Sequence, residues 1–279
     1  MTECGSRVKI KFQTPIENDY TLKMKIFLAI IIATSLVSCA QSTYKNMDFS
    51  SLGNPSDADF VDHLSATGEV FIKSNDVHLI RLSKESSAFL TSIYDRIVLN
   101  NEFFFNSQVR PTFHFIKNKT PFLFSLPNSE FYFSSGLVEN YLKSEEIFVA
   151  ALAAEIIKSQ RLIYEKKLII PVGNLSVEKM LSLCRIKSDV KVSVNEWAYS
   201  ILKRAGFDAS AYLNWIQVQN RNTLDFSFML GDAVGISKEE HLFKNYLSRQ
   251  GVAGVEKKNI EANSSKEFYK LLNNVVSIQ

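Results

Sequence analysis

Glu155 and Lys158 are the residues of this 279-residue chain whose types and spacing suggest chemistry. They lie in the run Ala154-Glu155-Ile156-Ile157-Lys158, inside the longest helical pattern, Glu145 to about Lys166. Residues three apart share a side of a helix. The carboxylate could act as a general base, and the ammonium group could neutralise it. We therefore expect either a Lys158 head group that neutralises a buried Glu155 or a solvated pair on a helix face.

The histidines give no support to a metal site. A zinc site on a helix needs two His one turn apart, so that both imidazoles reach one ion, with a Glu beside them and a third ligand from elsewhere. No two His of this chain stand at that spacing; they are His63, His78, His114 and His241. Each is predicted to be a surface or core residue.

Two separate stretches carry longer patterns, residues 120–159 and residues 195–216. The first resembles the gluzincin metallopeptidases that include HtpX, the BepA-type periplasmic proteases and the CAAX prenyl proteases, in which an edge strand and a Gly-Leu pair precede a His-Glu-x-x-His helix. The second resembles that family's Glu-x-x-Ala-Asp signature with the Ala-Gly-Tyr-Asp-Pro-x-Ala run after it. The resemblance covers about residues 65–250. Matching positions are Pro121-Phe122, Leu126-Pro127, Gly136-Leu137, Glu145-Glu146, Leu152, Ala198, Ala205-Gly206-Phe207-Asp208 and Ala211.

The zinc ligands of that family are missing from the matching positions. Ala154 and Lys158 stand where the family has its two His, and Asn195 stands where it has the Glu ligand. Tyr199 replaces the Asp that follows. Neither a methyl group nor an ammonium group can donate electrons to zinc, and an amide is a poor zinc ligand. Glu155 alone keeps its place, that of the general base, now vestigial, so we expect no zinc and no zinc-dependent proteolysis.

A peptide-binding segment is also implied by the resemblance. In the family, substrate peptide adds to the edge strand beside the active helix. The matching segment here is Glu130-Phe131-Tyr132-Phe133. Strand addition needs exposed backbone groups and side-chain pockets but no metal. These residues are therefore a candidate peptide-binding edge, and the alternative is that their aromatic side chains belong to the core.

The amino-terminal segment carries a secretion pattern. Residues 24–39 read MKIFLAIIIATSLVSC, with Lys23 and Lys25 ahead of the apolar run Ile26 to Ala33. This run is shorter than the roughly 20 residues that span a bilayer and is typical of a secretory signal peptide. Its ending, Leu36-Val37-Ser38-Cys39, resembles the lipobox of bacterial lipoproteins, in which the Cys is diacylglycerol-modified and acylated with chains such as palmitate. The alternative is a short buried helix that ends in Cys.

These patterns divide the chain into four parts. Residues 1–23 lack signal character and precede Met24, so we interpret them as an upstream extension from a misassigned start. Residues 24–38 are the predicted signal peptide, 39–60 a polar tether, and 61–279 the metallopeptidase-like domain. Ala40 after the lipidated Cys39, in place of Asp, favours the periplasmic face of the outer membrane or the cell surface. Cys184, the other cysteine left after processing, is predicted to be a buried apolar residue without a disulfide partner.

The net charge limits the class of partner, and the order of predicted elements indicates the fold class. Residues 1–38 hold five of the 32 Lys and Arg and three of the 29 Asp and Glu, which leaves 27 against 26 in the rest. Because residues 39–279 are nearly neutral, their charge gives no reason to expect nucleic acid as a partner. A small β portion before the long helix, then mostly helices, predicts an α+β fold. The expected elements are a hairpin over Glu69–Ser83, strands at Thr112–Ile116, Phe122–Leu126 and Glu130–Phe133, and helices at Lys84–Asn101, Leu137–Leu142, Ser176–Cys184, Val194–Ala205, Ala209–Gln219, Lys238–Arg249 and Ser265–Val276.

The sequence thus favours a lipid-anchored, non-catalytic domain that binds a polypeptide or another envelope protein. One alternative is a metalloendopeptidase or other hydrolase of altered mechanism that uses Glu155. A second is a purely structural lipoprotein whose cleft is filled.

Overall fold

The computed structural model describes residues 47–48, 56–170, 174–231, 233–251 and 264–276. The chain divides into two compact units, Met1–Lys45 and Asn46–Gln279, and all described residues belong to the second. The predicted upstream extension, the signal peptide and the lipidation site Cys39 lie outside the described residues. Within the described residues, no helix is long and apolar enough to cross a membrane.

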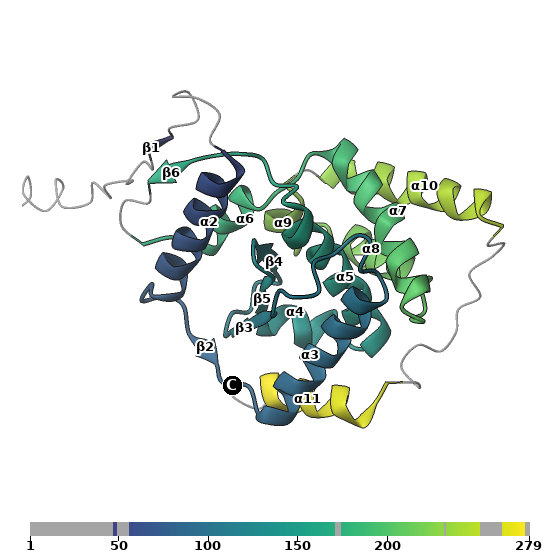
Figure 1. The fold of residues 1–279 in the computed structure, drawn as a ribbon, viewed down its shortest axis with the longest axis horizontal. Coiled ribbons are helices and arrows are strands. Elements are labelled where there is room, and N and C mark those ends of the chain that lie inside the picture. The colour runs from purple at the N-terminus through teal and green to yellow at the C-terminus, as the bar shows by residue number, and fades with distance from the viewer. Residues whose placement is uncertain (1–46, 49–55, 171–173, 232, 252–263, 277–279) are drawn as a thin grey trace, which may run out of the picture. The chain divides into compact units, whose positions relative to one another are not determined.

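A four-stranded sheet lies at the centre of the described unit (Figure 1). The strand order is β2 (Leu79–Ile80), β3 (Thr112–Ile116), β5 (Glu130–Ser134) and β4 (Leu123–Leu126). β3 and β5 run parallel, whereas β2 pairs with β3 and β4 pairs with β5 in the antiparallel sense. A separate short pairing joins β1 (Met47–Asp48) to β6 (Ile169–Ile170).

Both faces of this sheet are covered. Phe131 and Phe133 of β5 belong to a large hydrophobic cluster that includes α5, and Tyr132 between them belongs to a second cluster on the opposite face. β4 alternates in the same way, with Leu123 in the first cluster and Phe124 in the second. Successive strand residues point to opposite faces, so these apolar strands contribute to two cores at once.

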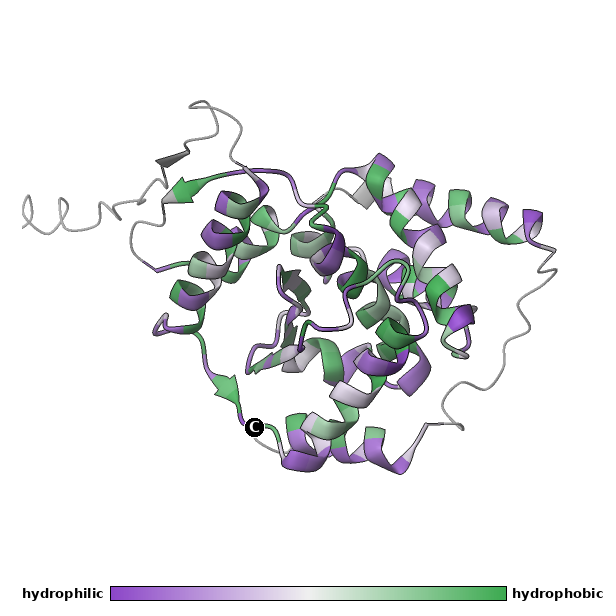
Figure 2. Cartoon of the chain, viewed as in Figure 1, coloured by the Kyte–Doolittle hydropathy of each residue, from purple (hydrophilic) through white to green (hydrophobic). Residues whose placement is uncertain are grey.

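Helices form the rest of the unit. α2 (Asp57–Ile72) and α6 (Val177–Leu183) contribute to the cluster on one face of the sheet. Figure 2 shows hydrophobic and hydrophilic residues alternating around α2, α3 and α10, as expected of helices with one buried side. The helices of the other cluster are α3 (Lys84–Leu99), α5 (Glu145–Arg161), α7 (Ser188–Arg204), α8 (Ala211–Arg221), α10 (Ala233–Arg249) and α11 (Lys266–Val276), and the short helices are α4 (Ser135–Asn140) and α9 (Ser227–Leu230).

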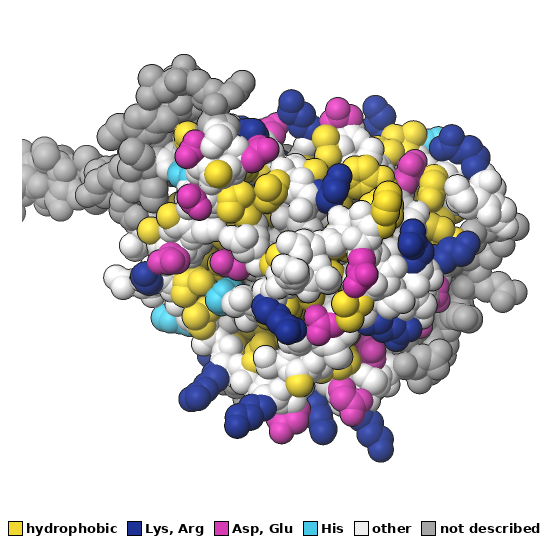
Figure 3. Space-filling view, in the orientation of Figure 1, with side chains coloured by type: hydrophobic (Ala, Val, Ile, Leu, Met, Phe, Trp, Pro, Cys, Tyr) yellow, Lys and Arg dark blue, Asp and Glu magenta, His cyan; other side chains and the backbone are white. Residues whose placement is uncertain are grey.

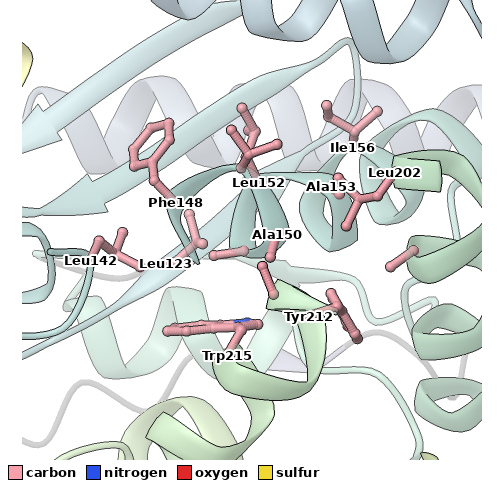
Figure 4. Packing of buried hydrophobic residues seen from close by; sticks show 14 of the residues in the cluster. Leu123, Leu142, Phe148, Ala150, Leu152, Ala153, Ile156, Leu202, Tyr212 and Trp215 are labelled. Atoms are coloured by element: carbon pink, nitrogen blue, oxygen red, sulfur yellow. The ribbon is translucent and has the colours of Figure 1, made fainter. Parts of the chain in front are cut away.

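α5 is the helix that the others surround. Ser144 caps its first turn by accepting the Ile147 N–H, and Leu162 ends it in the left-handed conformation at φ 50°. Small side chains let the neighbouring helices approach closely. Figure 4 shows Ala150 close to Tyr212 and Trp215 of α8. The burial of α5 on several sides explains why its sequence is apolar almost all round.

The predicted α+β class with dominant helices is confirmed, as are most of the predicted elements. α5 ends at Arg161 rather than Lys166 because Leu162 takes up the left-handed conformation. α7 begins at Ser188, six residues before the predicted start at Val194. α9 lies within the stretch 220–235, for which the sequence favoured no element.

The predicted hairpin over Glu69–Ser83 is wrong. Glu69 to Ile72 form the last turn of α2, which begins after the N-cap Ser56. The buried residues of α2 recur at helical spacing and include Phe60, Leu64 and Phe71, so tertiary burial of one helical stripe overrides the β-like composition of the last turn. Only Leu79–Ile80 forms a strand, and it pairs with β3.

Gly136, in the first turn of α4, makes the closest backbone approach of any described glycine. A Cβ atom there would lie 2.1 Å from the Lys119 carbonyl oxygen, and the Gly136 N–H donates to the Asn118 carbonyl at 2.9 Å. Backbone cannot rotate away as a flexible side chain can. We therefore expect Gly136→Ala to lower the free energy of unfolding by about 2–3 kcal/mol, measured by urea denaturation.

Gly235 in α10 is the matched control, because the nearest atom to its Cβ position is the Ser188 Oγ at 3.9 Å. Gly235→Ala should be neutral or stabilise the protein by up to about 1 kcal/mol, since Ala favours helix over Gly. Equal stability of the two variants would contradict the close approach at Gly136.

Candidate functional site

The four site positions predicted from two distant segments line one cavity. Ala154, Glu155 and Lys158 reach it from α5, and Asn195 reaches it from α7. The cavity has a volume of about 80 Å³, which has room for two or three water molecules at about 30 Å³ each. Its other walls include Leu123, Phe124, Leu181, Cys184, Trp215 and Glu239. Two segments about 40 residues apart in the sequence therefore meet at this cavity.

A buried ion pair occupies the middle of this site. The Lys158 Nζ lies 2.8 Å from the Glu155 Oε1 and 2.7 Å from the Oε2. The two side chains are only 12% and 8% exposed, so the solvated pair on a helix face is excluded and the neutralised buried carboxylate is the arrangement found. Taking a carboxylate out of water costs several kcal/mol unless a cation and hydrogen bonds compensate it. Lys158 provides that cation.

Hydrogen bonds complete the environment of Glu155. The Ser125 hydroxyl donates to its Oε2 at 2.8 Å, and the Tyr164 hydroxyl lies 3.0 Å from the Ser125 Oγ. Burial raises the pKa of Tyr164 well above its ordinary value, so this phenol keeps its proton and can donate it to Ser125. Both carboxylate oxygens thus accept at least one hydrogen bond.

Asn195 is held by a second polar network. Its Oδ1 accepts from the Tyr212 hydroxyl at 2.7 Å, and its Nδ2 donates to the Glu239 Oε1 at 2.8 Å. Lys191 adds a cation 3.7 Å from the Glu239 Oε2. Burial raises the pKa of Tyr212, which keeps it a donor. An amide suits this place because it accepts from the phenol and donates to the carboxylate, whereas a Glu could not donate to Glu239 unless protonated.

Sequence reasoning missed the partners that complete these networks. Ser125 was detectable as the one polar residue inside the apolar strand Leu123–Leu126. Tyr164, Tyr212 and Glu239 come from separate segments, and no spacing linked them to Glu155 or Asn195. Tyr212 and Glu239 are brought to the cavity only by the packing of α8 and α10 near α5 and α7, and Tyr164 reaches Ser125 from the segment after α5.

Cys184 also lines the cavity, and it is 2% exposed. Burial raises the pKa of its thiol to about 12, partly offset by the nearby Lys158 ammonium. The thiol therefore stays protonated at neutral pH and is a poor nucleophile. The prediction of a buried Cys184 without a disulfide is confirmed.

The donor set at this site does not fit zinc. Ala154 has no donor atom, Lys158 presents an ammonium group, and both ends of the Asn195 amide are already hydrogen-bonded. The carboxylate of Glu155 is paired. Across the described part of the chain, no cluster of three or more His, Cys, Asp or Glu side chains could hold a metal ion. Zinc sites in proteins use three protein ligands when catalytic and four when structural.

The expectation of a peptide-binding edge at Glu130–Phe133 is wrong. β5 is hydrogen-bonded to β3 on one side and to β4 on the other, so its backbone cannot pair with a peptide. Phe131, Tyr132 and Phe133 are fully buried, which is the alternative of core aromatics. Glu130 accepts a hydrogen bond from the Tyr132 hydroxyl.

α5 contributes to this strand order by holding the β4–β5 turn. The Ser159 Oγ accepts the Ser129 N–H at 2.8 Å and donates to the Leu126 carbonyl at 2.5 Å. Asn128 and Ser129 have positive φ of 62° and 59°, which reverses the chain between β4 and β5. β4 is the edge strand because β5 also pairs with β3.

Sequence comparison adds no known activity to this site. No family model matches the chain, and no curated protein matches its sequence significantly. What the site can do chemically is therefore judged from its geometry. Glu155 is paired with Lys158, Asn195 is hydrogen-bonded at both ends of its amide, and burial keeps the Cys184 thiol protonated.

Lys158→Met tests the ion pair. The variant leaves Glu155 buried without its cation and should lower the free energy of unfolding by about 3–5 kcal/mol. Lys73→Met is the matched control, because Lys73 pairs with Glu69 on α2 while both side chains are more than 70% exposed; it should cost less than about 1 kcal/mol. Thermal and urea unfolding measure both.

The double variant Glu155→Gln/Lys158→Met should recover part of the lost stability, because it removes the uncompensated charge. An unchanged melting temperature for Lys158→Met would contradict the buried pair.

Proposed function

We propose that this chain is a lipid-anchored envelope protein whose peptidase-like domain has lost its metal centre and acts by binding, not by catalysis. The observation that carries the proposal is the buried Glu155–Lys158 pair, 12% and 8% exposed for Lys158 and Glu155. In the resembled gluzincins this is the place of the zinc-binding helix turn. Here the ammonium group of Lys158 neutralises the carboxylate from inside the chain.

The convergence of the two sequence patterns supports a peptidase-like origin. Ala154, Glu155 and Lys158 belong to the first pattern and Asn195 to the second, and all four line the same small cavity. In the family, the matching residues must meet at one ion. A shared cavity is what a degenerate member of such a family would retain.

The size of the cavity favours a non-catalytic role. Its volume of about 80 Å³ is below the roughly 300–1,000 Å³ that is usual for small-molecule sites. Aromatic and aliphatic side chains such as Phe124, Leu181 and Trp215 occupy its walls. A peptide substrate would have no room beside Glu155.

An aromatic patch, defined as Phe103, Phe104 and Trp197, supports the binding role. These side chains are 90%, 36% and 40% exposed. Phe103 contacts Phe104 at a centroid distance of 5.7 Å, and Phe104 and Trp197 line one small pocket of about 80 Å³. Exposed aromatic groups that lie together are typical of protein interfaces. The partner class we propose is a polypeptide or another envelope protein.

Zinc content tests the loss of the metal centre. The purified chain, dialysed against zinc and then freed of loose metal, should contain no stoichiometric zinc by elemental analysis. The matched control is the triple variant Ala154→His/Lys158→His/Asn195→Glu, which restores three ligands and should bind about one zinc per chain. Stoichiometric zinc in the unaltered chain would overturn the proposal and reopen catalysis by a hydrolase that uses Glu155.

Membrane fractionation tests the anchor. In bacteria grown with labelled palmitate, the full chain should carry the label and sediment with membranes, and Cys39→Ser should lose both. Cys184→Ser is the control, since it removes the other cysteine of the mature chain and should stay labelled. Labelled Cys39→Ser protein, or no label on the unaltered chain, would contradict lipidation at Cys39.

A further inference from the structure

A second and larger cavity lies next to the site. Its volume is about 560 Å³, within the range of about 300–1,000 Å³ that holds small ligands. The segment before β6, the helix α6, the start of α7 and Gly231 form its walls. It shares Arg185, Ile186, Lys191 and Leu230 with the small cavity at Glu155.

The lining of this basic cavity is strongly positive. Its cationic side chains are Lys167, Lys179, Arg185, Lys187 and Lys191, and its acidic side chain is Glu165. Glu165 is already paired with Lys167. In the described part of the chain, no carboxylate lies within ion-pair distance of Lys179 or Lys187. Elsewhere the charges are mixed: both signs are interspersed over the face drawn in Figure 3.

Arg185 is held in place at the boundary between the two cavities. Its Nη2 donates to the Phe228 carbonyl at 3.0 Å, and its guanidinium packs over Gly231, where a Cβ atom would lie 2.4 Å from the Cζ. Its Nε is buried without a hydrogen-bond partner. A buried unsatisfied donor of a charged group is costly, and an anion in the cavity would offset its charge.

The amino terminus of α7 faces the same cavity. Lys187, Ser188 and Lys191 line it, and the N-cap residue Lys187 makes no side-chain capping hydrogen bond. The first N–H groups of this 17-residue helix therefore lack a side-chain acceptor from the cap. Together with the positive end of the helix dipole, such groups favour an anion.

The cations of the cavity lower the pKa of the Glu165 carboxyl. Its pKa lies below the ordinary value mainly because Lys167 donates to it. Desolvation opposes this shift, and the positive charges of Lys167, Lys187 and Arg185 each add a smaller lowering effect. Cations from two segments, Lys167 after α5 and Arg185 with Lys187 between α6 and α7, thus act on one point of the cavity.

We propose that the basic cavity binds a phosphate-bearing anion, either a soluble phosphorylated compound or the headgroup of an anionic lipid. A monocarboxylate would neutralise only one of several cations, whereas a phosphate group carries more charge and matches Arg and Lys donors. The inference does not depend on the loss of the metal centre, since none of its five cations is at a former ligand position.

Isothermal titration with inorganic pyrophosphate at low ionic strength tests the site on the full chain carrying Cys39→Ser, which lacks the anchor. We expect binding that weakens as salt is added. Adding Lys179→Gln/Lys187→Gln should weaken it by at least about tenfold, because two charge-assisted contacts are lost. Neither lysine side chain has an ion-pair partner in the described part of the chain, so the urea midpoint should not change.

Lys203→Gln is the matched control. It removes the same charge from the other end of α7, about 18 Å along the axis from Lys191, and should bind pyrophosphate as tightly as the parent chain. No binding by the parent chain, or equal binding by the double variant, would overturn the proposal.

Sedimentation with vesicles separates the two sources of phosphate. Vesicles of phosphatidylcholine with phosphatidylglycerol are compared with phosphatidylcholine alone. Pyrophosphate binding together with lysine-dependent sedimentation on the anionic vesicles assigns the cavity to a lipid headgroup. Pyrophosphate binding without such sedimentation assigns it to a soluble compound.

Discussion

A carboxylate in the middle of the central helix is the constraint on which the site depends. α5 packs between the sheet and the helices α7 and α8, so Glu155 cannot reach bulk water and must be compensated within the protein. Lys158 supplies the charge from one turn along the same helix, and Ser125 supplies a hydrogen bond from β4. Tyr164 then satisfies Ser125. The pair thereby links α5, the edge of the sheet and the segment after α5.

The same burial explains how the sheet is organised. α5 covers one face with its apolar side, and Ser159 near its end fixes the turn between β4 and β5. β5 lies inside the sheet because β3 and β4 pair on its two sides. Its Phe131 and Phe133 pack toward α5, and Tyr132 packs toward α2. On an edge strand these aromatic residues could form a peptide-binding surface. On an interior strand they contribute instead to the hydrophobic clusters on the two faces of the sheet.

The two adjoining cavities differ in how their charges are balanced. At the small cavity both carboxylates have a cationic partner: Lys158 balances Glu155, and Lys191 lies near Glu239. At the basic cavity the cations outnumber the carboxylates, and Lys179 and Lys187 face the space without an ion pair in the described part of the chain. Charges balanced from within favour stability, whereas unbalanced charges around an open volume favour an external ligand.

The sequence alone determined those helices and turns whose signals lie in neighbouring residues. The helix N-cap at Ser144, the apolar stripe of α3 and the turn residues around Asn128 specified their elements. The positions Ala154, Glu155, Lys158 and Asn195 were predicted from two sequence patterns, and they line one cavity. Tertiary structure decided what has no local signature. Glu69 to Ile72 became helix because Phe71 is buried, and Glu130–Phe133 became an interior strand because β3 and β4 pair on both sides. Tyr212 and Glu239 meet Asn195 only when α7, α8 and α10 pack together, and the cations of the basic cavity meet only when α6 and α7 pack. The free energy of such contacts depends on burial and distance, which spacing along the chain does not encode.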